Sequence, residues 1–198
     1  MRNNLFILLL MFICSGLFPS KAFGSTVSWG DVPSSGKYYL LARQTDDSRK
    51  VLTPRNFRYA NNSVLIFMPN TPQVGLSAWK FVAVDGKPLT FQLLNDEYGM
   101  AVDLSMGNGN NEWSDVLLWN ADAANPNQQL TFVPSRQQKG AYKIKGNSQN
   151  GTAFYIASRD TIRIGGSPET TFERVPNEAA ATDFVLREVT AKELSQAA

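Results

Sequence analysis

Four side chains in the middle of the chain have the types and order that suit a polyhydroxyl ligand. They are Asp103, Trp119, Asn127 and Gln128. A carboxylate and two amides can exchange hydrogen bonds with hydroxyl groups, and an indole ring can cover the apolar face of a sugar. These residues therefore predict a site for carbohydrate.

Three short apolar runs position these side chains, at residues 100–102, 116–119 and 130–133. Each run has the length of a strand, and the Gly, Asn, Asp and Pro residues between the runs are typical of turns. Asp103 directly follows the first run, Trp119 ends the second, and the two amide residues precede the third. The binding groups are thus expected at strand ends.

Each of the four residues also has a purely structural interpretation. Trp119 suits a buried aromatic at a strand end, and Asp103 suits an acceptor of backbone hydrogen bonds. Asn127 and Gln128 suit the bracing of a turn, as amide side chains commonly do. The residues alone leave both interpretations open.

The stretch at residues 93–133 resembles one repeat of the ricin B-type lectin family. In that family an Asp follows the first strand, an aromatic ends a QLW-like strand, and an NQxW-like turn leads into the last strand. The corresponding segments here are AVD (101–103), LLW (117–119) and NQQL (127–130). Leu130 replaces the usual final Trp, and Leu117 replaces the usual Gln. The resemblance implies a β-trefoil fold with a sugar site in this repeat.

A weak internal repeat extends over most of the chain. Aligning Trp79, Leu130 and Phe184 gives spacings of 130 − 79 = 51 and 184 − 130 = 54 residues. The predicted units are 37–87, 88–139 and 140–189, with an insertion near 165–180 in the third. About a dozen short strand signals and no clear amphipathic helix predict an all-β protein. Three four-stranded units are what a β-trefoil implies.

Only the second unit carries the acidic residue of the expected site. Leu52 and Ala157 stand where Asp103 would fall in the first and third units. We therefore expect one competent sugar site at most. Trp79 and Phe184 are expected in the core.

Residues 1–24 have the features of a cleaved secretory signal peptide. Arg2 precedes an apolar run at 5–18, and the small residues Ala22 and Gly24 mark possible cleavage positions. The run is short for a membrane span, so no membrane insertion is expected. We predict a secreted or periplasmic protein with one domain at 25–189. The tail at 190–198 is expected to be a frayed helix or disordered.

The charge balance excludes several classes of partner. Removing Arg2 and Lys21 with the leader leaves 19 − 2 = 17 basic residues against 17 acidic ones. A nearly neutral chain without a basic stripe argues against nucleic acid and anionic membranes. The expected partner is a glycan or glycoprotein, with a second protein chain as the alternative.

Catalysis has little support in the sequence. The chain has no histidine, and its single cysteine, Cys14, lies in the leader. Triads, histidine-based zinc sites and a cysteine nucleophile are therefore not expected, and no cofactor is predicted. The turn at 120–127 lacks the regular carboxylates of a calcium loop, so no metal site is predicted. We expect a protein that is not an enzyme.

Two alternative functions follow from other resemblances. Related trefoil proteins serve as cell-binding subunits of bacterial toxins. This implies, as an alternative, a non-catalytic subunit that holds or delivers an enzymatic partner. The segment SSGKYYLLAR (34–43) resembles the opening strand of the Kunitz soybean-inhibitor family, although that family's disulfides are absent. A trefoil protease inhibitor is the third hypothesis.

Overall fold

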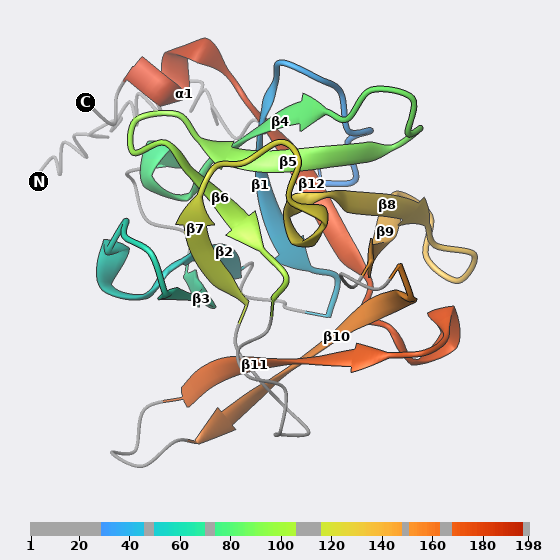
Figure 1. Cartoon of the computed structure of the whole chain (residues 1–198). Helices are drawn as coiled ribbons and strands as arrows, with labels where there is room; N and C mark the ends of the chain where they lie inside the picture. Colours follow the sequence, from blue (N-terminus) through green and yellow to red (C-terminus); the bar gives the residue numbers. More distant parts are fainter. Residues whose placement is uncertain are drawn as a thin grey trace, which may run out of the picture.

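The structure is a computed structural model that describes residues 29–45, 50–69, 74–105, 116–147, 151–162 and 168–195. Within these residues the regular structure is almost entirely β, with one five-residue helix, α1 (Ala191–Ser195) (Figure 1). The strands are β1 (Tyr38–Arg43), β2 (Lys50–Pro54), β3 (Ser63–Pro69), β4 (Trp79–Ala83), β5 (Thr90–Asn95), β6 (Met100–Asp103), β7 (Leu117–Asn120), β8 (Leu130–Pro134), β9 (Ala141–Asn147), β10 (Ala153–Ile162), β11 (Pro168–Val175) and β12 (Phe184–Val189). The prediction of an all-β protein is confirmed.

Six strands close into a barrel through antiparallel pairs. The pairs are β1–β4, β4–β5, β5–β8, β8–β9, β9–β12 and β12–β1. The other six strands form three hairpins, β2–β3, β6–β7 and β10–β11. Each run of four consecutive strands therefore supplies two barrel strands with one hairpin between them, which is a threefold pattern.

The third hairpin differs from its sequence-based prediction. The weak repeat predicted an insertion near 165–180 in the third unit, and residues 163–167 lie outside the described residues. Instead, β10 is a single ten-residue strand, and β11 occupies much of the expected insertion. Eight residue pairs join them, and Figure 1 shows this hairpin extending away from the barrel. The run Thr170-Thr171-Phe172 has high β propensity, which the surrounding Glu and Pro residues concealed in the sequence.

The barrel interior is filled by large apolar side chains from all three units. Trp79 and Phe184 are each 1% exposed, as the sequence predicted. The Phe81 ring lies 4.7 Å from the Tyr39 ring and 5.1 Å from the Phe132 ring, centroid to centroid. Such tilted aromatic packing stabilises a core that contains no disulfide.

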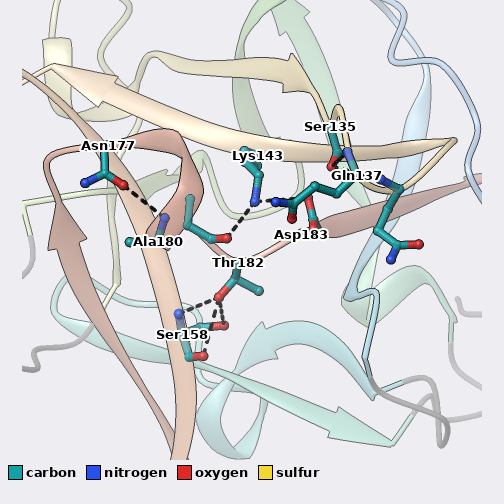
Figure 2. A network of polar contacts seen from close by, with 10 residues as sticks. Ser135, Gln137, Lys143, Ser158, Asn177, Ala180, Thr182 and Asp183 are labelled. Carbon is teal, nitrogen blue, oxygen red and sulfur yellow. Dashed lines mark hydrogen bonds and ion pairs between the residues drawn. The ribbon is translucent and has the colours of Figure 1, made fainter.

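A buried ion pair ties β9 to the segment before β12. Lys143 is 2% exposed, and its Nζ donates a hydrogen bond of 2.8 Å to the carbonyl oxygen of Ala181. The same Nζ lies 3.3 Å from Asp183 Oδ1, within ion-pair distance but without hydrogen-bond geometry. Figure 2 shows the Lys143 side chain reaching both oxygen atoms. Nearby, Thr182 Oγ1 accepts a hydrogen bond of 2.8 Å from the backbone N–H of Ser158 in β10.

The β10–β11 hairpin is also tied to the first unit by charge. The Arg43 guanidinium donates a hydrogen bond of 2.9 Å to Asp160 Oδ2, and Lys50 Nζ lies 3.5 Å from the same atom. Burial raises the pKa of Asp160, but the hydrogen bonds and charges of these two cations outweigh it and lower the pKa overall. Asp160 is therefore ionised at neutral pH.

Candidate functional site

The β6–β7 hairpin places Asp103 and Trp119 on the same face. Asp103 pairs with Leu117, and Ala101 pairs with Trp119. Directly opposite residues share a face, as do residues two positions apart on one strand. The opposite face of the hairpin contributes Met100, Val102 and Leu118 to the core. Strand alternation thus turns the carboxylate and the indole away from the barrel interior.

Trp119 is an exposed aromatic residue. Its exposed fraction is 40%, against 0% for its neighbour Leu118. The structural interpretation of Trp119 as a buried core residue is therefore wrong. An exposed indole on a rigid strand is available to cover a ligand.

Asp103 is nearly buried and is held by three hydrogen bonds. Its Oδ1 accepts a bond of 2.8 Å from the backbone N–H of Ser105. Its Oδ2 accepts bonds from Asn125 Nδ2 at 3.1 Å and Gln128 Nε2 at 3.2 Å. An ionised carboxylate offers about four acceptor positions, so one remains for a ligand hydroxyl. The residue is only 4% exposed, so its contact with a ligand is limited to a small part of its surface.

Gln128 has no exposed surface, and its whole amide is bonded within the protein. Besides Asp103, its Nε2 donates a bond of 3.0 Å to the carbonyl oxygen of Asn120. Its Oε1 accepts bonds from the Asp122 backbone N–H at 2.9 Å and from Gln92 Nε2 at 3.4 Å. These contacts make Gln128 a residue that positions Asp103 and the turn after β7.

Asn127 lies in a turn that its neighbours determine. Asn125 caps the 3-10 helix η3 (Pro126–Gln128), and its Oδ1 accepts a bond of 3.0 Å from the Asn127 backbone N–H. Pro126 follows the cap, where a missing backbone N–H has no cost. The Asn127 carbonyl oxygen accepts a bond of 2.9 Å from Leu104 N–H, which fixes the turn beside the end of β6. In the described part of the chain, the Asn127 side-chain amide makes no hydrogen bond.

The structure adds residues that sequence reasoning missed. Asn125 donates directly to Asp103, and the Asn-Pro pair at 125–126 was the available signal for a capped turn. Arg174 of β11 donates two hydrogen bonds of 2.9 Å to the carbonyl oxygens of Leu104 and Ser105. The third hairpin therefore holds the segment that follows Asp103. The polar loop at 106–115 lies outside the described residues.

The Gln128→Ala variant is expected to weaken ligand binding without removing a ligand contact. The change leaves the Asn120 carbonyl and the Asp122 N–H unpaired, and each such loss costs about 1–3 kcal/mol. Asp103 also loses a donor and its fixed orientation. We expect denaturant unfolding to show a loss of about 2–4 kcal/mol in the free energy of unfolding. A Gln129→Ala variant, which keeps all bonds to Asp103, is the matched control, and equal effects from the two changes would contradict the positioning role.

No metal site is formed by the residues that the structure describes. They contain no group of three or more His, Cys, Asp or Glu side chains that could hold an ion. Within the same residues, no helix is long and apolar enough to cross a membrane.

The comparisons with known proteins identify the fold. No family model matches the sequence, and no curated protein matches it. A structure described as the BEL β-trefoil matches with a TM-score of 0.57 and 14% identity, over 80% of this chain and 97% of that chain. The fold is a β-trefoil.

Two further matches are to the structures of a lectin and of a toxin. The Polyporus squamosus lectin, bound to a human-type influenza-binding epitope, gives a TM-score of 0.55 and 14% identity over 79% of this chain and 50% of that chain. The cytolethal distending toxin from Actinobacillus actinomycetemcomitans gives 0.52 and 17% over 79% of this chain and 94% of that chain. The resemblance to β-trefoil lectins that the sequence predicted is confirmed at the level of the fold.

Proposed function

We propose that the protein is a carbohydrate-binding, lectin-like protein with one shallow site on the outer face of the β6–β7 hairpin. The observation that carries the proposal is the exposed indole of Trp119 on the same face as a carboxylate that two side-chain amides hold in place. The side chains in this arrangement suit ligand binding better than covalent or acid–base catalysis. We therefore propose a protein that is not an enzyme.

Three side chains contact the ligand, each in a different way. The Trp119 ring covers the apolar face of one sugar residue, and this contact does not require a charge on the sugar. Asp103 accepts a hydrogen bond from a sugar hydroxyl through its remaining acceptor position. Asn127 offers both a donor and an acceptor from its unpaired amide. Gln128 contributes by positioning Asp103.

The other two hairpins lack the acidic residue, which supports a single site. Leu52 is 3% exposed and belongs to the core cluster, and Ala157 is 8% exposed. A buried apolar side chain cannot replace a carboxylate as an acceptor for hydroxyls. We therefore propose that only one of the three hairpins carries a sugar site of this type.

A shallow site of this kind binds weakly. Few atoms of a sugar are buried on one face of a hairpin, and association entropy opposes binding. We expect a dissociation constant of about 1 mM for one sugar residue. Stronger attachment to a glycan-bearing surface then needs several copies or further contacts.

A glycan array tests the function directly. The protein, produced by secretion so that the predicted leader at 1–24 is removed, is expected to bind a restricted set of glycans. Multivalent display on the array compensates for the weak single-site affinity. A chain with correct β-type circular dichroism that binds no glycan at any density would contradict the proposal.

The match to the cytolethal distending toxin supports a second candidate, a non-catalytic subunit of a secreted toxin-like complex. In this role the protein holds or delivers an enzymatic partner chain. Purification from the native source under mild conditions then yields a stoichiometric second protein. A protein that is strictly monomeric in that preparation and binds glycans would favour the lectin proposal.

A further inference from the structure

A hollow of about 280 Å³ lies beside the turn after β5, apart from the site at Trp119. It is bounded by the start of β1, the 3-10 helix η2 (Val74–Ser77), the β5–β6 turn and α1, which packs against η2. None of the four residues of the proposed sugar site lines it. Its volume is just below the roughly 300–1,000 Å³ of pockets that hold drug-sized molecules. The space suits one small ring.

Asn95 places a nearly buried hydrogen-bond donor in the wall of this hollow. The residue is 8% exposed, and its Oδ1 accepts a bond of 3.1 Å from the Tyr98 backbone N–H. Its side-chain NH₂ makes no hydrogen bond to any other described residue. The residue lines the hollow, so this donor is free to bond a ligand held there.

Asp96 supplies the matching acceptor. Its Oδ2 accepts bonds from Tyr38 Oη at 3.0 Å and Lys80 Nζ at 2.7 Å. Both bonds end on the same oxygen, so Oδ1 keeps its acceptor positions in the described part of the chain. Burial, reinforced by Asp96, raises the pKa of Tyr38, which therefore stays protonated and holds the carboxylate in place. Glu97 adds a second carboxylate at the rim.

The remaining wall is apolar. Leu76, Ala78 and Leu194 line it, and Leu194 comes from α1. A donor, an acceptor and an apolar wall together fit a ligand whose hydroxyls both donate and accept and whose ring has an apolar face. An ammonium group would make no use of the Asn95 donor, and an anion would be repelled by the carboxylates of Asp96 and Glu97.

We propose that this hollow is a second carbohydrate site, which takes one sugar residue. The ligand class rests on the proposed function, but the position and the contacting residues are independent of Trp119. Two sites on one small domain would let a branched or multivalent glycan bind more tightly than either site allows alone.

Two-dimensional ¹H–¹⁵N NMR titrations test this proposal. The probes are methyl glycosides of galactose, glucose and N-acetylglucosamine, with n-butylamine as the cationic comparison. The amide signals of residues 95–98 and 194–195 are expected to shift with at least one glycoside and not with the amine. In a Trp119→Ala variant these shifts persist, which separates this site from the first one.

Two variants are expected to weaken glycoside binding in the hollow, each for a different reason. Leu194→Trp fills the space, and Asn95→Asp keeps the acceptor for the Tyr98 N–H while removing the donor. Each is expected to weaken the glycoside-induced shifts at 95–98 by about tenfold or more. Lys192→Ala, an exposed change on the same helix, is the control that leaves them intact. Glycoside shifts that survive in both variants, shifts with the amine alone, or no shifts at these residues would overturn the proposal.

Discussion

The Trp119→Ala variant is expected to lose glycan binding at the outer face of the β6–β7 hairpin while keeping the fold of the parent protein. The indole is 40% exposed on the outer face of the hairpin and belongs to none of the core clusters, so its removal leaves the barrel core intact. Covering an aromatic ring contributes about 1.5–3 kcal/mol, which is roughly a 10- to 150-fold change in the dissociation constant. A parent affinity of about 1 mM then falls beyond detection.

Parallel binding and unfolding measurements distinguish a lost ligand platform from a damaged fold. The free energy of unfolding should fall by no more than about 1 kcal/mol, because the core clusters stay intact. Trp119→Phe keeps an aromatic face and should retain part of the binding. Undiminished glycan binding by Trp119→Ala would show that the indole is not the platform.

The second large effect is expected from Lys143→Met. This change keeps most of the apolar stem but removes the charge that lies 3.3 Å from Asp183 Oδ1 and the donor to Ala181. Both partners lie in a largely buried environment, where the Lys143 and Asp183 side chains are 3% and 15% exposed. Removal of one member of a buried pair costs about 3–5 kcal/mol, because the other charge stays without compensation.

Urea unfolding of Lys143→Met, Asp183→Asn and the double variant measures this coupling. The double variant is expected to be more stable than Lys143→Met, since it leaves no uncompensated charge. Lys139→Met, a change at an exposed position in the turn between β8 and β9, is the control and should have an effect below about 0.5 kcal/mol. Strictly additive losses in the double variant would contradict the assigned ion pair.

The strands that carry Asp103 and Trp119 were predictable from the sequence. Both residues end or directly follow short apolar runs bounded by turn-rich segments, and these runs form β6 and β7. The buried positions of Trp79 and Phe184 were predictable from their alignment with Leu130 in the weak internal repeat. These features depend on patterns that can be read from the sequence alone.

The roles of the amides were not predictable from spacing. The sequence places Gln128 near the site, but its amide points into the protein because η3, started by Asn125 and Pro126, sets its direction. The unpaired donor of Asn95 and the hollow beside it depend on η2 and α1, which are far apart in the chain. Contacts of this kind arise from tertiary packing, which local propensity does not encode.

Strand β11 was not predicted from the sequence because of its amino-acid composition. Its sequence, Pro168–Val175, contains two Glu residues, an Arg and a Pro, which weaken an ordinary strand signal. In the fold, Thr170 Oγ1 accepts a bond of 3.0 Å from the Phe67 backbone N–H, and Phe172 enters the core cluster. Tertiary contacts therefore stabilise a strand whose local sequence is ambiguous.

A crystal structure of the protein with the best glycan from the array tests the central claim most directly. The account predicts density for one sugar residue over the Trp119 indole, with hydroxyl groups within hydrogen-bond distance of Asp103 and Asn127. Density in the hollow beside Asn95 would be a second, separate result. A glycan that binds the protein in solution but leaves the outer face of the β6–β7 hairpin empty in the crystal would contradict the account.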